Sequence, residues 1–289
     1  MRLGVNSRDN LKGFIGIGTM GFPIAMALAN SGVNLLCYDI DQRKSEVLSS
    51  KKSITIASGL SDFSSCKTIY LSLPGPKEVE DTVTQLCRLN LDENSVIIDL
   101  STNDLATVQR MHQLMQNKNL VYVDSPLSGG KKAAEKCSLT VMISGNGSAI
   151  ASHRKEIGTF ASKIFMLDAV GSATIIKLIN NQIFLTTSVI LQEAMKTAEK
   201  SNLNRDQVLE ILKASSAGPV TKLASLVLAE NTKQDIFSLN IAHKDLKLAR
   251  ELAKGDSNMR LTEAALEVYQ TAIDSGYGDH DFFATGKIL

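Results

Sequence analysis

The sequence contains no tryptophan, only 5 prolines and almost no excess of one charge, because 31 basic side chains balance 30 acidic ones. A formal net charge of +1 gives no overall field that would attract nucleic acid or an anionic membrane. No unbroken apolar run approaches the roughly 20 residues of a membrane-spanning helix, and the first ten residues lack the apolar stretch of a secretory signal. We therefore expect a cytoplasmic protein that binds neither nucleic acid nor membrane.

Cysteine is also scarce, and its spacing excludes two common uses. Cys37, Cys66, Cys87 and Cys137 form neither a CxxC pair nor a zinc-like cluster with the 4 histidines. We expect free, buried thiols, no disulfide and no metal site.

What the sequence does contain indicates two domains within 289 residues. β-rich runs at 14–17, 35–38, 68–73, 96–100, 120–123 and 139–143 alternate with helical patterns such as 24–30 and 79–86. This alternation predicts a mostly parallel, doubly wound α/β domain. After Gly171 only helical patterns follow, at 173–201, 205–213, 219–229, 241–254 and 260–273. We expect an α/β domain in 1–169 and an all-α domain in 170–289.

A glycine motif directly follows the first β-rich run. Gly16, Gly18 and Gly21 have GxGxxG spacing, with Thr19 and Met20 inside the motif and a helical pattern after it. In such a turn the first glycine permits the tight bend, the second lets a pyrophosphate approach the backbone, and the third lets helix and strand pack closely. The context favours a dinucleotide site over a turn without a ligand.

Asp39 ends the second β-rich run, 23 residues after Gly16. An acid near this position accepts hydrogen bonds from ribose hydroxyls and repels a 2′-phosphate, which favours NAD. Arg43 and Lys44 follow shortly and offer positive charge for that phosphate, so NADP is not excluded. Asp39 would alternatively be a turn or helix-capping residue that shares this role with Asp41.

The helical pattern from residue 173 is apolar on nearly every side, which is typical of a buried helix, yet it carries Lys177 near its beginning. Lys177, Asn181, Phe184 and Ser188 are spaced to share one face. Desolvation would lower the pKa of such a lysine and make it a proton donor and acceptor near neutral pH, as hydride transfer to or from a hydroxyl-bearing carbon requires. The alternative is a lysine that extends from the helix end to solvent.

The segment DSPLSGG, residues 124–130, follows the fifth β-rich run, where an open α/β sheet binds its ligands. Ser128 offers a hydroxyl, and Gly129 and Gly130 can present backbone N–H groups to a carboxylate. A purely structural turn explains the same spacing equally well.

Four ordered motifs together resemble the β-hydroxyacid dehydrogenase family: GxGxMG at 16–21, DSPLSGG at 124–130, GSATIIKLINN at 171–181 and HKDLKLA at 243–249. The family includes 3-hydroxyisobutyrate dehydrogenase, tartronate semialdehyde reductase and glyoxylate/succinic semialdehyde reductases, with 6-phosphogluconate dehydrogenase as a larger relative. The resemblance implies a Rossmann-type dinucleotide-binding domain joined by a long helix to a helical domain for substrate binding and dimerisation. It also implies hydride transfer between NAD(P) and a small carboxylate substrate, in a homodimer or homotetramer.

The resemblance also implies roles for single residues. Lys177 matches the family's catalytic lysine, Asn181 with Asn180 matches the asparagine that holds the substrate, and Ser128, Gly129 and Gly130 resemble the carboxylate-binding loop. Leu73 and Pro74 resemble a loop along the cofactor, Thr102 a group near the nicotinamide ribose, and Lys244 a lysine near the nicotinamide. Phe237 and Asp245 are similar to positions that close the site from the second domain.

The chain departs from the family pattern at three places. Asp104 and Leu105 stand where a proline is frequent, and Cys137 replaces a usual glycine. Asp39 begins a sequence unlike the Asn-Arg-Ser/Thr pattern of members that use NADP, which again favours NAD. Two other functions remain to be distinguished by assay: a dinucleotide-binding redox sensor or scaffold without turnover, and an imine-reducing relative, although the latter commonly lacks the lysine.

Overall fold

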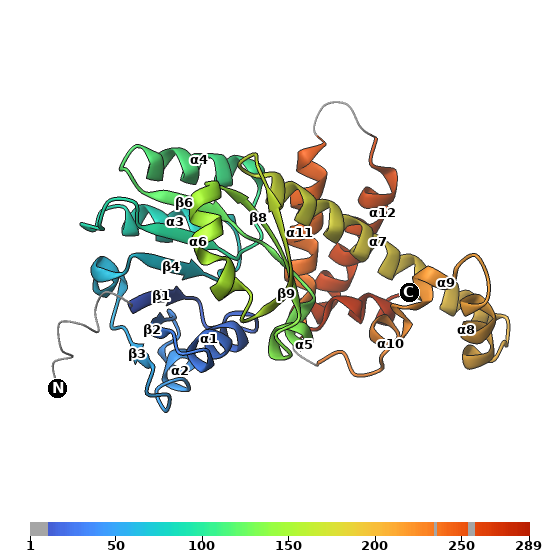
Figure 1. The fold of residues 1–289 in the computed structure, drawn as a ribbon. Helices are drawn as coiled ribbons and strands as arrows, with labels where there is room; N and C mark the ends of the chain where they lie inside the picture. Colours follow the sequence, from blue (N-terminus) through green and yellow to red (C-terminus); the bar gives the residue numbers. More distant parts are fainter. Residues whose placement is uncertain (1–10, 234–235, 254–257) are drawn as a thin grey trace. The chain divides into compact units, whose positions relative to one another are not determined.

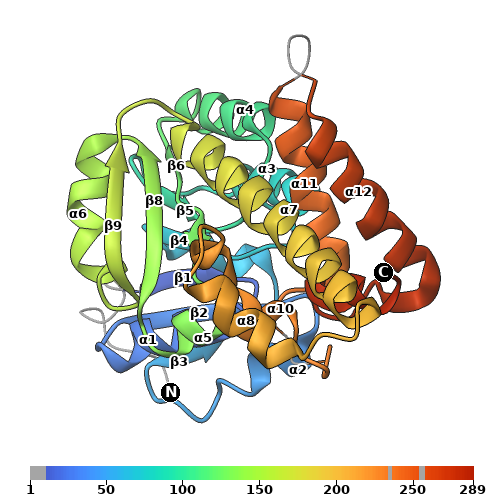
Figure 2. The same cartoon turned by 90° about the vertical axis from the view of Figure 1, so that its right-hand side faces the viewer.

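The structure is a computed structural model that describes residues 11–233, 236–253 and 258–289 (Figures 1 and 2). The chain divides into two compact units, Met1–Lys177 and Leu178–Leu289, and each has its own hydrophobic core. Residues 1–10, in which the sequence shows no secretory signal, and the last residue of the expected helix 241–254 lie outside the described residues.

The first unit is built on a nine-stranded sheet with the order β3-β2-β1-β4-β5-β6-β8-β7, in which β9 also pairs with β8 (Figure 1). The strands are β1 (Leu11–Ile15), β2 (Asn34–Tyr38), β3 (Ile54–Ile56), β4 (Thr68–Leu71), β5 (Val96–Asp99), β6 (Val121–Asp124), β7 (Leu127–Ser128), β8 (Leu139–Gly145) and β9 (Ala161–Leu167). Among the strand pairs of the described residues, β6–β8 and β7–β8 are antiparallel and the others are parallel. The expectation of a mostly parallel α/β domain is confirmed.

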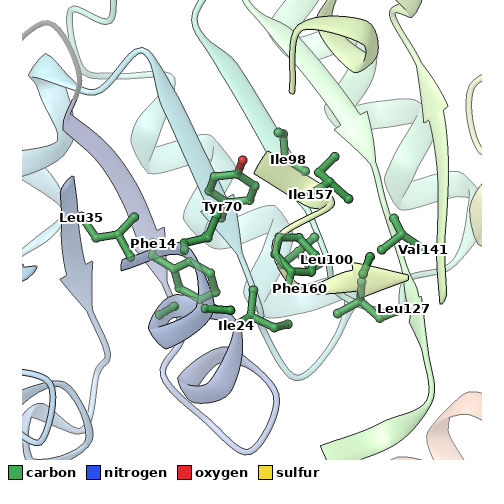
Figure 3. Packing of buried hydrophobic residues seen from close by; sticks show 14 of the residues in the cluster. Phe14, Ile24, Leu35, Tyr70, Ile98, Leu100, Leu127, Val141, Ile157 and Phe160 are labelled. Atoms are coloured by element: carbon green, nitrogen blue, oxygen red, sulfur yellow. The ribbon is translucent and has the colours of Figure 1, made fainter. Parts of the chain in front are cut away.

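Helices cover both faces of this sheet, because successive strand residues point to opposite sides. The helices are α1 (Gly21–Asn30), α2 (Gln42–Glu46), α3 (Pro76–Leu86), α4 (Leu105–Gln116), α5 (Gly130–Glu135) and α6 (Gly147–Ile157), with a 3₁₀ turn η2 (Leu60–Ser65). Phe14 and Ile98 pack with α1, α5 and α6, whereas their neighbours Ile15 and Ile97 pack with α3 and α4. Figure 3 shows the first of these clusters, in which the rings of Phe14 and Tyr70 stack with centroids 6.1 Å apart.

The second unit is helical, as expected for the residues after Gly171. It contains most of α7 (Ser172–Lys200), then α8 (Arg205–Lys213), α9 (Gly218–Thr221), α10 (Ala224–Val227), α11 (Leu239–Leu252), α12 (Arg260–Ala272), a π-helical turn η3 (Ile273–Tyr277) and a 3₁₀ turn η4 (Phe282–Lys287). Buried residues of α7, α11 and α12, among them Leu185, Leu246 and Tyr269, form its core, and Figure 2 shows these helices side by side.

Several details differ from the sequence expectations. The helix expected at 219–229 is two short helices, α9 and α10. Three strands were not expected. β3 and β7 are only three and two residues long, too short for a clear apolar pattern, and β9 exposes polar Ser162 and Lys163 together with apolar Phe165 and Met166, so its exposed side chains do not alternate in polarity. Cys37, Cys66 and Cys87 are free and buried as expected, but Cys137 is exposed, so its expected burial is wrong. Cys137 lies two residues after the end of the short helix α5, outside the sheet.

The expectation that α7 is buried all round is also wrong. Ile176, Ile179, Ile183 and Ile190 are 41%, 46%, 63% and 55% exposed, and they recur at helical spacing along one side. By length and composition α7 would be able to cross a membrane, the one helix of the described residues of which this is true. Its polar residues nevertheless make core contacts: the Gln192 amide donates to the carbonyl oxygens of Val227 and Phe283. Such contacts are those of a core helix in a folded domain.

Candidate active site

The glycine motif connects the end of β1 to the start of α1, and each glycine meets a different steric constraint. Gly16 has φ of +95°, and a Cβ there would lie 2.2 Å from the carbonyl oxygen of Ser72. A Cβ on Gly21 would lie 1.9 Å from the carbonyl oxygen of Gly16, whereas a Cβ on Gly18 would meet no atom within 4 Å. These are the constraints of a tight turn, a close helix contact and an open approach for a ligand. The motif therefore fits a dinucleotide pyrophosphate.

Thr19 and Met20 complete this turn directly before α1. The Thr19 side chain is exposed and Met20 is half-buried. Backbone N–H groups at the beginning of a helix lack intrahelical acceptors and therefore suit an anionic ligand. Among the described residues, no side chain caps α1. A bound anion would therefore not have to displace a capping carboxylate from these N–H groups.

Asp39 is buried behind the glycine turn. Its carboxylate accepts hydrogen bonds from the backbone N–H of Ile17, at 2.7 Å, and from that of Asp41, at 2.9 Å. These two hydrogen bonds give Asp39 the turn role that the sequence left open. Asp41 in turn accepts two hydrogen bonds from the Arg43 guanidinium, at 2.9 and 3.0 Å. These bonds lower the pKa of Asp41 and raise that of Arg43.

A buried carboxylate, Asp99, organises the segments that follow β4 and β5. It is 1% exposed and accepts hydrogen bonds from the Ser101 N–H at 2.9 Å, the Asn103 amide at 2.7 Å and the Tyr122 hydroxyl at 2.6 Å. Ser101 Oγ then accepts a hydrogen bond from the backbone N–H of Leu73. The structure thus brings the turn before Thr102 together with the turn that contains Leu73 and Pro74.

Burial dominates the electrostatics of Asp99, because desolvation raises its pKa despite the hydrogen bonds that act in the opposite direction.

Asp104, at the frequent proline position of the family, caps α4 by accepting from the Thr107 N–H at 2.6 Å. That interaction gives a physical reason for an acid there.

The 124–130 segment is only partly a loop. Leu127 and Ser128 form β7 and pair with Val141 and Thr140 of β8, so the expected single loop is interrupted by a short strand. Ser128 is half-buried, and Gly129 and Gly130 have φ of +128° and +65° before α5 begins. Successive glycines with positive φ are compatible with a nest-like turn, and the binding of a carboxylate by their N–H groups stays a prediction.

The first turn of α7 is tied to the sheet near this segment. Asp124 is 2% exposed, and its carboxylate accepts from Ser144 Oγ at 2.7 Å and from the backbone N–H groups of Gly171 and Thr174, at 3.3 and 3.2 Å. Desolvation raises the pKa of Asp124, again against these hydrogen bonds. Lys177 is half-buried, one helical turn after Thr174.

The second unit holds the remaining candidate residues. The Asn181 side-chain amide donates to Asp245 Oδ2 at 2.6 Å, and Asn180 donates to Asn181 Oδ1 at 3.1 Å. Lys244 Nζ lies 3.0 Å from Asp245 Oδ1. Asn181 and Asp245 are buried, whereas Asn180 is exposed. The structure therefore joins α7 and α11 by one group of hydrogen-bonded and ion-paired side chains, those of Asn180, Asn181, Lys244 and Asp245.

Phe237 belongs to an aromatic cluster of the second unit. Its ring centroid is 6.0 Å from that of Phe282, which is itself 5.1 Å from that of Phe184 on α7. The backbone of Phe237 also accepts a hydrogen bond from the Phe282 N–H at 2.7 Å. These contacts give Phe237 a packing role in the helical unit.

Asp99 and Asp124 were missed as site residues, although the sequence contains a signal for them. Each is the last residue of an apolar strand, in VIID and VYVD, and the two are register partners on β5 and β6. Because ligands bind beyond the carboxyl ends of parallel strands, acids at those ends were candidates for ordering the site.

Comparison with known proteins identifies the family. Residues 12–168 match the NAD-binding domain of 6-phosphogluconate dehydrogenase, and residues 171–289 match the NAD-binding region of NADP-dependent 3-hydroxyisobutyrate dehydrogenase. The chain belongs to the β-hydroxyacid dehydrogenase family. This dehydrogenase is accordingly an NAD(P)-dependent oxidoreductase, and the redox-sensor alternative receives no support.

Relatives along the whole chain agree with this assignment. The dehydrogenase is 25% identical to 2-(hydroxymethyl)glutarate dehydrogenase of Eubacterium barkeri, over 96% of this chain and 93% of the relative. It is 28% identical to glyoxylate/succinic semialdehyde reductase 1 of Arabidopsis thaliana, over 94% and 96%. Its fold is similar to that of Mycobacterium tuberculosis 3-hydroxyisobutyrate dehydrogenase solved with L-serine, with a TM-score of 0.87, 22% identity, and coverage of 97% of this chain and 99% of that structure.

Proposed function

We propose that Lys177 moves the proton in hydride transfer between NAD and a small β-hydroxy acid or the corresponding semialdehyde acid. The observation that carries this proposal is the attachment of α7: its first turn is hydrogen-bonded to Asp124, the residue that opens the 124–130 segment, and Lys177 follows one turn later. An amine held there, half-buried, is suited to take up and return the proton of a substrate hydroxyl.

The cofactor supplies or accepts the hydride at its nicotinamide ring. In our proposal Ser128 and the backbone N–H groups of Gly129 and Gly130 bind the substrate carboxylate, and Asn181, supported by Asn180, orients the hydroxyl. In the oxidative direction Lys177 accepts the hydroxyl proton as the carbon loses hydride. In the reductive direction it returns that proton to the alkoxide oxygen.

The other assigned residues would act on the cofactor or close the site. Gly16, Gly18, Thr19, Met20 and Gly21 would hold the pyrophosphate, and Leu73, Pro74, Thr102 and Lys244 would lie along the rest of the cofactor. Phe237 and Asp245 would close the site. We also propose the division into a dinucleotide-binding domain, 1–169, and a substrate and dimerisation domain, 170–289.

The substrate class follows from the groups available to bind it. A serine hydroxyl with two flexible glycine amides suits one carboxylate, and Lys177 suits one ionisable hydroxyl. The named relatives act on 2-(hydroxymethyl)glutarate and on glyoxylate or succinic semialdehyde, which all carry a carboxylate. We infer that this dehydrogenase uses a short acid of the same kind.

NAD is the preferred cofactor in this proposal. Asp39 and Asp41 place two carboxylates at and beyond the end of β2, and Arg43 already pairs with Asp41. A 2′-phosphate at the end of β2 would therefore meet carboxylates, and Arg43 is already engaged by Asp41. We expect kcat/KM at least about tenfold higher with NADH than with NADPH, and a reduced preference in Asp39→Asn; an equal or better NADPH reaction in the unmodified enzyme would contradict the assignment.

A screen of short aldehyde acids with NADH and NADPH tests the whole proposal. Glyoxylate, succinic semialdehyde, tartronate semialdehyde and methylmalonate semialdehyde cover the class, and Lys177→Ala should abolish turnover while NADH binds nearly as before. Tight NADH binding without turnover of any acid would instead favour the sensor. Unchanged turnover by Lys177→Ala with a good substrate would refute the catalytic role.

The quaternary structure and location are proposed as a homodimer or homotetramer in the cytoplasm. Size-exclusion chromatography with light scattering gives the number of chains, and cell fractionation gives the compartment. A monomer at working concentration would contradict the first part.

A further inference from the structure

The carboxylate of Asp124 joins three elements of the first unit. Asp124 is the last residue of β6. Its carboxylate accepts hydrogen bonds from Ser144 Oγ of β8 and from the backbone N–H groups of Gly171 and Thr174 at the start of α7. Ser144 Oγ, which is fully buried, accepts a further bond from the Ala173 N–H at 3.1 Å. All these atoms lie within Met1–Lys177.

This arrangement replaces an ordinary helix cap. The first N–H groups of a helix have no intrahelical acceptor and are usually satisfied by a side chain directly before the helix. Gly171 has no side chain and has φ of +84°, so the acceptors come from sheet residues tens of positions earlier in the sequence. A negative charge at this end of a 29-residue helix is also favoured by the helix dipole.

The bonds fix the helix close to Lys177. Thr174 and Lys177 are three residues apart, which corresponds to about 4.5 Å along the helix axis. The backbone from which the Lys177 amine extends is therefore located by Asp124 within one helical turn. Ser144 belongs to β8, the strand that also pairs with Ser128 through Thr140, so the same strand positions the predicted carboxylate-binding residue.

We propose that Asp124 is a positioning residue of the dehydrogenase: its hydrogen bonds to the first turn of α7 set the location of Lys177 relative to Ser128. This inference rests on the catalytic role proposed for Lys177. It predicts a loss in the chemical step without a matching loss of binding, because cofactor and carboxylate contacts stay in place while the proton-transferring amine is displaced. A displacement of about 1 Å can cost up to about a hundredfold in rate.

The test compares Asp124→Asn, Asp124→Ala and Ser144→Ala with Asn146→Ala. Asn146 caps α6 by accepting from the Ala149 N–H at 2.9 Å, so its variant loses a helix-terminal bond of the same kind on a helix without site residues. Steady-state kcat and KM, NADH affinity by fluorescence and the melting temperature are measured for each variant. Ser144→Ala keeps the carboxylate and serves if Asp124→Ala does not fold.

We expect kcat to fall about tenfold to a hundredfold in Asp124→Ala, less in Asp124→Asn, which keeps one acceptor oxygen, and severalfold in Ser144→Ala. KM and the NADH dissociation constant should stay within about twofold. Asn146→Ala should lose stability but keep kcat. An unchanged kcat in Asp124→Ala, or in Ser144→Ala if Asp124→Ala does not fold, with Lys177→Ala inactive, would overturn this inference alone. An active Lys177→Ala would instead remove the proposed function on which it rests.

Discussion

The side-chain amide of Asn181 donates a 2.6 Å hydrogen bond to Asp245, which is 1% exposed, and so joins α7 to α11. Asp245 Oδ1 also lies 3.0 Å from Lys244 Nζ. One buried carboxylate therefore contacts both Asn181 and Lys244, to which the family resemblance gives roles at the substrate and at the nicotinamide. Its importance for either role is open to a direct experiment.

Asp245→Ala should lower both stability and substrate affinity. Hydrogen bonds to charged groups contribute about 1.5–3 kcal/mol, so we expect the free energy of unfolding in urea to fall by about 2 kcal/mol. Because Asn181 loses the bond that orients it, KM for the best acid should rise severalfold. Glu263→Gln is the matched control, since it breaks an exposed ion pair between α11 and α12, with Arg250, and should cost under about 1 kcal/mol. An unchanged KM in Asp245→Ala would contradict the orienting role.

The glycine turn predicts opposite effects for two alanine substitutions. Gly21→Ala places a Cβ against the Gly16 carbonyl and should destabilise the fold by several kcal/mol. Gly18→Ala meets no protein atom within 4 Å and should keep the melting temperature of the unmodified enzyme, while its Cβ enters the space needed by the pyrophosphate. NADH titration should then show affinity reduced at least about tenfold. Normal NADH binding by Gly18→Ala would argue against the pyrophosphate site.

Cys137 has φ of +51°, in the left-handed region, at a position where the family usually has glycine. A non-glycine residue pays a conformational cost there, partly offset by the greater freedom that glycine gives the unfolded chain. We expect Cys137→Gly to stabilise the protein by about 0.5–1 kcal/mol, seen as a melting temperature higher by a few degrees. Cys137→Ala removes the thiol but keeps the Cβ, and it should show no such gain; equal gains in both variants would assign the effect to the thiol.

His153 should make stability depend on pH. Its Nδ1 donates to the Ala149 carbonyl at 2.8 Å, and in the neutral ring Nε2 accepts from the Thr68 hydroxyl at 2.9 Å. Burial lowers its pKa, Lys12 lowers it further, and Glu156 and the bond to Ala149 raise it. Because the folded-state pKa lies below the ordinary 6.5, the contribution of the neutral ring is present above that pH and is lost as pH falls through the folded-state pKa.

Urea unfolding of the native enzyme and His153→Gln between about pH 8 and pH 5 tests this dependence. The difference in unfolding free energy should shrink toward acid by at most about 1.4 kcal/mol per pH unit. Asp99 and Asp124 have raised pKa values, and their effect has the opposite sign, since stability from them is lost as pH rises. Both carboxyls are present in each protein, so they cancel in the difference. A difference that does not vary with pH would contradict the assignment.

Much of the fold was predictable because its signals are local. The apolar runs predicted β1, β2, β4, β5, β6 and β8 to within a few residues, and α8 has the predicted bounds, Arg205–Lys213. The spacing of the glycines likewise predicted a tight turn at Gly16 and close packing at Gly21, and a Cβ at either position would meet a backbone carbonyl oxygen. The role of Gly18 in pyrophosphate binding stays a prediction. The short strands β3 and β7 carry too few residues for such a pattern, and the exposure of one side of α7 depends on what packs beside it.

The sequence by itself determined the strand and helix periodicity, the glycine turn and the chemical types present at the site, because backbone sterics and hydrophobic alternation act over a few neighbouring residues. Only the tertiary structure decided which carboxylate meets which helix. The bonds from Asp124 to Gly171 and Thr174 span 47 and 50 residues, and the bond from Asn181 to Asp245 spans 64. Formation of the core removes these polar groups from water. Each group then forms its hydrogen bond with the polar group that the fold places beside it.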